Sequence, residues 1–443
     1  MKHFAWTLPT LLLVAGLAGY RYVGRHGVSV ISPTADRSRP EITSVVTAEW
    51  PWWRGPLGTG VSLTAKPPLR WSESEGVRWK VAVPGRGHSS PVVCGDRVLL
   101  STADDTEQTM SLLCYRRRDG ILLWATPIQR GGFMAKHDKN SHASPTPVCD
   151  GRRVTVSFVA EDSLWVTAVD LDGQISWRTR VGPFHSQWGY GSSPAYWRGL
   201  VIVAADNKGP RLADLAATTS YLAALDAETG DIVWRVRRPR EYSYGTPVVA
   251  EVAGRWQVLL AGHQTIAAYD PATGRELWHC GSSLTRTAGT IAFDADHVYA
   301  SGSFPAPEIT CIRADGEGDV SETHVEWRQT RGAADVPSPL VLDGRVLVVN
   351  DNGVAVCFDA AGGKVLWQQR LGGAFSASPV AADGVVYAVN EDGRTIVFRA
   401  GAKFEKVADN RLDGAVYASP VPVGDDLLIR TEHALYCLTG GER

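Results

Sequence analysis

Four histidines lie in or beside the long polar segments of the first half of the chain, where their side chains could transfer protons or bind a transition metal near neutral pH. They are His88, His137, His142 and His185. Histidine pairs that bind a metal are usually separated by about three to five residues, and only His137 and His142 have this spacing. Both fall in a segment without strand or helix periodicity. We therefore predict no metal site.

The same segments carry a mixed set of polar and aromatic side chains. Each residue taken singly is better explained as solvating a loop or satisfying a strand end, but mixed polar and aromatic groups gathered on one face of a rigid scaffold are typical of a small-ligand or peptide site. The candidate binding residues are His88, Lys136, His137, Lys139, Asn140, His142, His185, Trp188, Tyr190, Asp206, Asn207, Arg240, Glu241 and Tyr244. No Gly-rich phosphate loop and no nucleophile-base motif is present, so we predict no catalytic residue.

The segments that carry these residues interrupt a repeat. Its clearest copy ends in Leu-Asp-Ala-Glu-Thr-Gly-Asp-Ile-Val-Trp at 225–234, and a Gly followed four residues later by a Trp recurs along the chain. Self-similarity at about 40–50 residues indicates stacked four-stranded units. The Trp residues of these units are Trp79, Trp124, Trp177, Trp234, Trp278, Trp327 and Trp367.

Each unit begins with a short dipeptide before an apolar strand, and a proline at a strand's first residue removes no ladder hydrogen bond. The starts are Ser90-Pro91, Ser144-Pro145, Ser193-Pro194, Thr246-Pro247, Gly289-Thr290, Ser338-Pro339, Ser378-Pro379 and Ser419-Pro420. The last unit supplies three strands, and residues 77–81 supply the fourth. The sequence predicts an all-β, eight-bladed β-propeller of four-stranded antiparallel blades, closed by an N-terminal strand.

Several residue types are assigned to this architecture rather than to chemistry. We expect the seven Trp side chains to wedge between neighbouring blades, and Arg235, Arg237 and Arg238 to shield exposed strand edges. Six of the seven cysteines occupy equivalent places in different units, where the architecture should hold them apart, so we expect small buried side chains rather than disulfides. These positions are Cys114, Cys311, Cys357 and Cys437 in one set, and Cys94 and Cys149 in another.

The chain is predicted to contain one closed body and an N-terminal extension. Residues 1–27 fit a signal peptide or an N-terminal membrane anchor, residues 28–49 a flexible tether, and 50–443 the propeller, with a Trp-rich segment at 50–75 and blades at 76–440. We expect the propeller to lie outside the cytoplasm, either in the periplasm or secreted. If the chain is anchored to the inner membrane, residues 4–23 are expected to be the anchor, and the N-terminal segment is expected to make the only contact with the membrane. Residues 50–53 should pack against the propeller, or else form a second contact.

The loops of the predicted propeller differ between its two faces. Turns between first and second strands, and between third and fourth strands, are tight, whereas residues 129–142, 181–191, 206–219 and 237–245 form long loops on the other face. Long loops on a rigid scaffold are where binding usually occurs. The formal net charge of −2 with no basic stripe argues against nucleic acid as a partner. A protein or peptide partner at the face of blades 1–4 is expected, with a monomeric propeller.

Residues Ala224 to Trp234 match the pattern Ala-x-Asp-x-x-Thr-Gly-x-x-x-Trp. This resembles the pyrroloquinoline-quinone-like (PQQ-like) repeat, a β-propeller family, over residues 76–440, and Trp50 to Pro56 resembles the opening of secreted planctomycete propellers. The family includes quinone-dependent dehydrogenases and the non-catalytic propeller that assists outer-membrane β-barrel assembly. The resemblance implies either a binding module or an enzyme.

The enzyme branch of this family has features that the chain does not reproduce. Its members carry two adjacent cysteines near the quinone and a Ca²⁺ site, and no Cys-Cys pair is present here. The resemblance therefore favours a non-catalytic binding or scaffold module without a cofactor. The alternative is a PQQ-dependent oxidoreductase with PQQ and Ca²⁺, in which Trp188 would stack on the quinone and Lys or Arg would meet its carboxylates.

Overall fold

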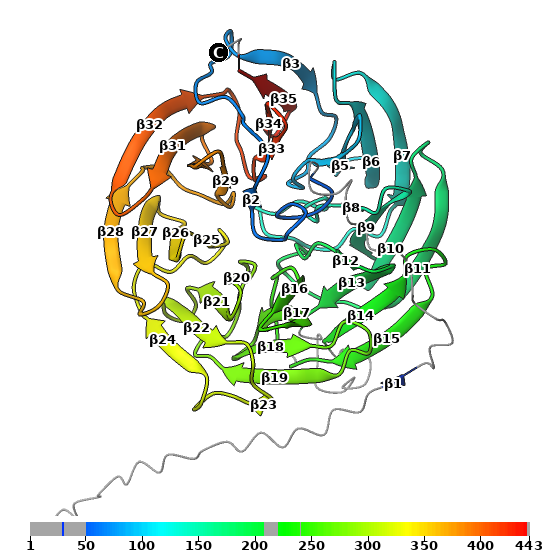
Figure 1. Ribbon diagram of the computed structural model, residues 1–443. Coiled ribbons are helices and arrows are strands. Elements are labelled where there is room, and N and C mark those ends of the chain that lie inside the picture. The colour runs from blue at the N-terminus through cyan, green and yellow to red at the C-terminus, as the bar shows by residue number, and fades with distance from the viewer. Residues whose placement is uncertain (1–28, 31–49, 208–219, 240, 441–443) are drawn as a thin grey trace, which may run out of the picture.

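The computed structural model describes residues 29–30, 50–207, 220–239 and 241–440. Over these residues the chain forms eight sheets, each built on four antiparallel strands, arranged in a ring about a central axis (Figure 1). No helix long and apolar enough to cross a membrane is found within this part of the chain. The prediction of an all-β, eight-bladed propeller is confirmed.

The first four blades follow one another along the chain, each running from an inner to an outer strand. Blade 1 contains β4 (Val92–Cys94), β5 (Arg97–Asp104), β6 (Thr109–Arg116) and β7 (Leu122–Arg130). Blade 2 contains β8 (Val148–Cys149), β9 (Arg153–Ala160), β10 (Ser163–Asp170) and β11 (Ile175–Pro183). Blade 3 contains β12 (Ala195–Trp197), β13 (Leu200–Ala205), β14 (Tyr221–Asp226) and β15 (Ile232–Arg237), and blade 4 contains β16 (Val248–Val252), β17 (Arg255–Gly262), β18 (Thr265–Tyr269) and β19 (Glu276–Gly281).

The remaining blades complete the ring, and the last one joins the two ends of the propeller. Blade 5 contains β20 (Ala292–Phe293), β21 (His297–Gly302), β22 (Glu308–Arg313) and β24 (Val325–Gln329), and blade 6 contains β25 (Leu340–Leu342), β26 (Arg345–Val349), β27 (Val354–Asp359) and β28 (Val365–Arg370). Blade 7 contains β29 (Val380–Ala382), β30 (Val385–Val389), β31 (Arg394–Ala400) and β32 (Phe404–Arg411). Blade 8 contains β33 (Val421–Val423), β34 (Asp426–Arg430), β35 (Ala434–Thr439) and the N-terminal β3 (Val77–Ala82).

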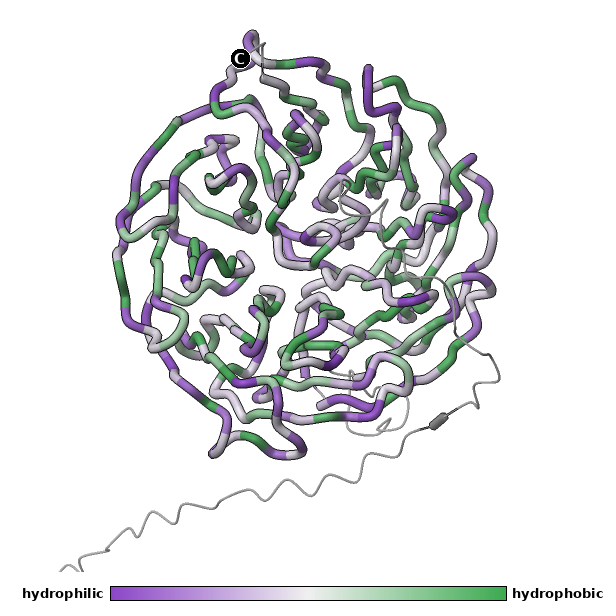
Figure 2. Tube along the Cα trace, viewed as in Figure 1, coloured by the Kyte–Doolittle hydropathy of each residue, from purple (hydrophilic) through white to green (hydrophobic). Residues whose placement is uncertain are grey.

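Three two-residue strands extend these sheets. The strand β1 (Ser29–Val30) pairs with the outer β15, β23 (Gly318–Asp319) pairs with the outer β19, and β2 (Val61–Ser62) pairs with the inner β29. Middle strands such as β13 are buried along their whole length, whereas the outer β28 is largely exposed. Figure 2 shows hydrophobic stretches within the blades and an alternation of hydrophilic and hydrophobic residues along the outer strands.

The repeated Trp of each outer strand lies opposite a small residue of the third strand. The Cα partners include Cys114 and Trp124, and Ala224 and Trp234. A register shift beside each such pair gives the outer strand a bulge, which increases the local twist. The opposing residue is Cys or Ala in all seven pairs. The four cysteines at this position are therefore small buried partners of a large ring, and they are free thiols.

Six of these seven rings donate a hydrogen bond to the turn of the next blade. The Trp234 indole donates a hydrogen bond to the Pro271 carbonyl, and a Cβ placed on Gly274 would lie 2.6 Å from the ring. Trp79, Trp124, Trp177, Trp327 and Trp367 donate to turn carbonyls of the following blade in the same way. Trp278 differs: blade 5 carries an insertion around β23, and this indole donates to Gln257 of its own blade.

The inner ends of the blades are joined by hydroxyl side chains around the axis. The Ser338 amide donates to the Ser378 hydroxyl, the Ser378 amide to the Ser419 hydroxyl, and the Ser419 amide to the Ser90 hydroxyl. Thr146, Ser193, Thr246 and Thr290 continue this hydroxyl ring, which we define by these eight residues. The unit start predicted at Ser144-Pro145 is wrong by two residues, because Thr146-Pro147 repeats the same dipeptide pattern and occupies the ring.

Two cysteines are closer than the repeat predicted. Cys94 ends β4 and Cys149 ends β8, which are the innermost strands of neighbouring blades. A hydrogen bond with the Cys94 thiol, together with burial, raises the pKa of Cys149 well above its usual value. The expectation that equivalent cysteines are held apart is wrong for this pair, because neighbouring blades converge where their inner strands approach the axis.

The N-terminal part of the propeller crosses the axis beneath the hydroxyl ring. We call residues 50–62 the floor segment. The amides of Val93 and Cys149 donate to the Trp50 and Pro51 carbonyls, which attaches its start to blades 1 and 2. Trp52 stacks on Tyr196 of blade 3 with ring centroids 6.1 Å apart. Residues 50–53 thus pack against the propeller, as predicted.

A buried arginine attaches the rest of the floor segment to the opposite side of the ring. The Arg54 guanidinium donates to the carbonyls of Pro339 in blade 6 and Pro379 in blade 7. Burial lowers its pKa to about 9. The Gly60 carbonyl then accepts from Ala381 of blade 7. The floor segment therefore spans the channel from one side to the other.

Candidate functional site

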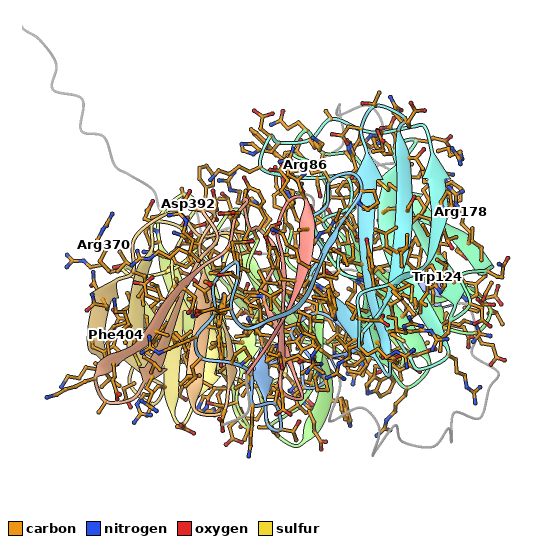
Figure 3. All side chains as sticks on the ribbon, turned by 90° about the horizontal axis from the view of Figure 1, so that it is seen from above. Arg86, Trp124, Arg178, Arg370, Asp392 and Phe404 are labelled. Carbon is orange, nitrogen blue, oxygen red and sulfur yellow. The ribbon has the colours of Figure 1, made fainter. Side chains whose placement is uncertain are left out.

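A cavity of about 480 Å³ lies on the axis above the floor segment. With the exception of Trp53, every lining residue belongs to a segment that leads into the innermost strand of a blade. These segments reach one face of the disc together with the second-to-third loops. Figure 3 views the disc from its edge, with Arg86 and Asp392 on this upper face. The cavity is therefore built by all eight blades and lies at the loop-rich face.

Six of the predicted binding residues line this cavity. They are His88, His137, Lys139, Asn140, Trp188 and Tyr244. His137 and Trp188 come from different long loops, and their rings lie 5.5 Å apart. The Asn140 amide donates to the Trp188 carbonyl, which links the same two loops. The long loops of blades 1 and 2 thus meet at the cavity mouth.

Two predicted residues form an ion-pair cluster away from the cavity. His142 Nδ1 lies 2.8 Å from Asp105 Oδ1, and Lys136 Nζ lies 3.3 Å from Asp105 Oδ2. Burial alone would raise the pKa of Asp105, but its hydrogen bond with His142 and the charge of Lys136 lower it. The His142 Nε2 atom contacts the Met134 carbonyl. The side chains of Lys136 and His142 therefore stabilise the loop through contacts with Asp105 and Met134.

The other predicted residues are placed elsewhere by burial or by their own partners. His185 faces Asp162 at 3.5 Å, and the buried Tyr190 donates to the Ala204 carbonyl. Asn207 is buried and bonds to Ser220 and to the Ala205 carbonyl. Asp206 is paired with Arg238, Glu241 does not line the cavity, and Arg240 lies outside the described residues. Within the described part of the chain, no three His, Cys, Asp or Glu side chains are grouped to hold a metal ion.

Several lining residues were missed by reasoning from the sequence. Trp53 reaches the cavity from the floor segment, and its indole donates to the Thr290 hydroxyl at 2.8 Å. Tyr417, Arg286 and Asp335 come from links of ordinary length in the second half of the chain. The hydroxyl ring supplies most of the remaining polar lining. The strand-start dipeptides were the sequence signal for the residues of the hydroxyl ring, because the Ser or Thr of each ring dipeptide lies next to the axis.

The charged groups at the cavity are paired with one another. Lys139 Nζ lies 3.0 Å from a Glu391 carboxylate oxygen, and Arg286 Nη2 lies 3.6 Å from Asp335 Oδ2. Lys139 lies in the link from blade 1 to blade 2 and meets Glu391 of blade 7, whereas Arg286 and Asp335 lie in the links that lead into blades 5 and 6. The cavity therefore carries little net charge, and its rings and hydroxyls dominate its chemistry.

The family model described as outer membrane protein assembly factor BamB matches residues 108–315, 262–349 and 308–403 of this chain. The matched residues run without a gap from 108 to 403, which is more than half of the sequence. The chain belongs to this family of PQQ-like repeat propellers. No protein of curated function matches it in sequence.

Solved structures with a similar fold include BamB and two quinohemoprotein alcohol dehydrogenases. BamB from Moraxella catarrhalis is 14% identical, with a TM-score of 0.60, over 83% of this chain and 98% of that one. Quinohemoprotein alcohol dehydrogenase from Comamonas testosteroni is 13% identical, with a TM-score of 0.64, over 93% of this chain and 83% of that one. A second quinohemoprotein alcohol dehydrogenase, from Pseudomonas putida, is 12% identical, with a TM-score of 0.59, over 90% of this chain and 81% of that one. At these identities the likeness shows the fold alone.

The cavity residues do not fit the Ca²⁺ site that accompanies the quinone in the dehydrogenase branch of the PQQ-like family. Ca²⁺ takes six to eight oxygen ligands, including several carboxylates. Asp335 is the one carboxylate among the lining residues of the described chain, and it already faces Arg286. We therefore derive no reaction step through a quinone-Ca²⁺ pair.

His88 is held neutral in this propeller. Its ring stacks on Tyr417 with centroids 4.5 Å apart. Burial, followed by the positive charges of Arg430, Arg86 and Lys136, lowers its pKa to about 3. Arg430 is itself fully buried and donates to the Ser89 and Ser101 carbonyls. A neutral imidazole therefore faces the cavity at ordinary pH.

The lowered pKa of His88 predicts a pH-dependent stability. An unfolded histidine binds a proton below about pH 6.5, whereas folded His88 resists protonation down to about pH 3. Between about pH 3 and pH 6.5 the unfolded state therefore binds more protons than the folded state. The contribution of neutral His88 to the free energy of unfolding is complete above about pH 6.5, and it is lost as the pH falls towards 3. We expect the free energy of unfolding of His88→Gln to fall less steeply between pH 6.5 and 4.5 than that of the native chain. Urea titrations across this range measure the slopes; equal slopes would contradict the burial of a neutral His88.

Proposed function

We propose that this chain is a non-catalytic, extracytoplasmic binding module that receives a segment of a protein or peptide partner in the axial cavity. The observation that supports this most directly is the closed floor beneath an aromatic, nearly neutral cavity at the loop-rich face. Concave, mostly apolar sites with a few polar groups are typical of ligand binding. The rigid ring and the long loops of blades 1 and 2 would position the partner.

The family match supports the same proposal at a coarser level. Its description names an assembly factor, a class of protein that works by binding others. By extension we place the chain outside the cytoplasm, in the periplasm or secreted, as a monomeric propeller. Residues 4–23, which the sequence suggests as a membrane anchor, lie outside the described residues. An intact-mass measurement of the mature protein tests whether they are retained.

The quinone-dependent oxidoreductase is the second candidate. It is favoured by the dehydrogenase from Comamonas testosteroni, which aligns with 93% of this chain, and by Trp53 and Trp188 in an axial cavity. Titration of the full chain with pyrroloquinoline quinone, with and without Ca²⁺, separates the two proposals. Tight binding with dye reduction in the presence of an alcohol or sugar would overturn the binding-module proposal.

The binding proposal predicts that the mouth residue Trp188 is needed for partner capture. A random peptide library is selected on the immobilised full chain, and the enriched peptides are measured by calorimetry. Trp188 is 37% exposed, so Trp188→Ala removes a large contact surface at little cost to folding, and we expect affinity to fall at least about tenfold.

Trp256 provides a matched control for Trp188. It is also 37% exposed, but it stands on β17 beside Trp197, away from the cavity. We expect Trp256→Ala to bind the selected peptides as the native chain does. A library that yields no binder, or binders that are unaffected by Trp188→Ala, would refute the proposed binding function of this face.

A further inference from the structure

We propose that the axial cavity recognises an aromatic side chain that carries a hydrogen-bond donor, a tyrosine or tryptophan of the bound segment. The inference rests on the binding function proposed above and names the chemistry of the residue that anchors the partner. Such side chains dominate the binding energy of many interfaces, because they fill a pocket and also need a polar partner.

The first support is the number of rings that face a cavity of limited size. Trp53 forms its base, His88 and Tyr417 are stacked on one side, and Trp188 and Tyr244 stand on another. Aromatic rings gain from offset or edge contacts with another ring beyond the area they bury. A cavity of about 480 Å³ admits one large side chain and its backbone rather than a folded domain.

The second support is a set of polar groups on the cavity lining that lack a hydrogen bond within the described structure. His88 Nε2, Tyr244 Oη and Asp335 Oδ1 make none, and the Asp335 side chain, which is 23% exposed, stands 3.6 Å from Arg286, beyond hydrogen-bond distance. The exposed part of this carboxylate can accept a hydrogen bond from a donor that a ligand brings into the cavity, and such a bond to a charged group is favourable. A phenol O–H or an indole N–H can donate to the Asp335 carboxylate, whereas a phenylalanine ring cannot.

The third support is the pairing of charge, which disfavours an ion as the anchoring group. Lys139 forms an ion pair with Glu391, and Arg286 forms one with Asp335. A carboxylate or an ammonium group entering the cavity would have to break one of these pairs. A neutral ring with one donor leaves both pairs intact and can still donate a hydrogen bond to the exposed part of the Asp335 carboxylate.

The test uses the full chain and four small probes: N-acetyl-tyrosinamide, N-acetyl-tryptophanamide, N-acetyl-phenylalaninamide and N-acetyl-leucinamide. Ligand-observed NMR titrations give their relative affinities. We expect the tyrosine and tryptophan amides to bind about fivefold or more tightly than the phenylalanine amide, in line with one added hydrogen bond, and the leucine amide to bind most weakly. The peptides enriched from the library should carry tyrosine or tryptophan.

Variants separate the hydrogen bond from the ring contacts. Asp335→Ala should abolish the preference for tyrosine over phenylalanine and leave phenylalanine binding unchanged, whereas Trp188→Ala should weaken all three aromatic probes. Trp256→Ala should change none. Equal binding of phenylalanine and tyrosine amides by the native chain would refute the inference. So would library peptides that need Trp188 but carry no aromatic residue, although the proposed function would stand; a library without binders would instead remove the proposed function.

Discussion

Replacing Asp206 by alanine is expected to lower the free energy of unfolding by about 3–5 kcal/mol. Both Asp206 oxygens accept hydrogen bonds from the Arg238 guanidinium, at 2.8 and 2.9 Å. The Arg238 side chain is 0% exposed and that of Asp206 is 4% exposed. Loss of the carboxylate would leave a buried cation whose remaining side-chain hydrogen bond, among the described residues, is to the Tyr269 hydroxyl. Chemical denaturation monitored by tryptophan fluorescence measures the change.

Two further variants show whether burial is the cause of this loss. Glu405 pairs with Arg399 at 2.8 Å, but both side chains are more than half exposed. Glu405→Ala should therefore cost about 0–1 kcal/mol. The double replacement Asp206→Leu with Arg238→Met removes both charges together and should recover most of the lost stability. A single Asp206→Ala variant as stable as the native chain would show that Arg238 is not buried as described.

The Asp206–Arg238 pair also illustrates what sequence patterns could not show. From the sequence, Asp206 was a binding candidate in a long loop and Arg238 a charge at an exposed edge. The structure instead buries both on blade 3, where Asp206 follows β13 and Arg238 follows β15, and Arg238 also reaches Tyr269 of blade 4. A pattern of exposed and buried positions within one strand carries no information on pairs formed between the ends of non-adjacent strands. The expectation that Arg238 shields an exposed edge was therefore wrong, and Asp206 is a buried partner of Arg238.

The architecture could be predicted because its determinants are local and repeated. The spacing of Gly230 and Trp234 within one unit fixes both the turn and the ring that packs on the turn of the next blade. Copies of the same signal reinforce one another, so the number of blades and the closing strand at 77–82 were accessible. An ambiguous copy remained, since Ser144-Pro145 and Thr146-Pro147 are alike and only the hydrogen-bonded ring distinguishes them.

The candidate site was predicted only in part, because it depends on proximity to the axis. Loop length identified His137 and Trp188, which are long-loop residues at the mouth. Asp335 and Tyr417 enter by links of ordinary length, which are indistinguishable in sequence from other connections between blades. Trp53 lies outside the repeat altogether and reaches the cavity because the floor segment crosses the channel. Composition carries no signal for such a crossing.

Replacing Trp234 by alanine is the second large effect, with an expected loss of about 3–5 kcal/mol. The ring is 1% exposed and belongs to the core between blades 3 and 4. Its removal leaves a cavity that the surrounding strands cannot collapse to fill, because Gly274 and the Pro271 carbonyl are held by the turn of the next blade. Trp367 occupies the equivalent place in blade 6 but is only partly buried, so Trp367→Ala should cost less. Denaturation midpoints of the two variants provide the comparison.

A double-variant cycle with Gly274 tests the contact itself. Gly274 has a φ of +72°, and a Cβ at this position would lie 2.6 Å from Trp234 Cε3. Gly274→Ala in the native chain should therefore suffer both the left-handed backbone cost of about 1–2 kcal/mol and a clash with the ring. In the Trp234→Ala background the clash is absent and only the backbone cost remains, so the two losses should sum to more than the loss of the double variant. Strict additivity would mean that the ring does not rest on this turn, and the ring contact as the link between neighbouring blades would have to be abandoned.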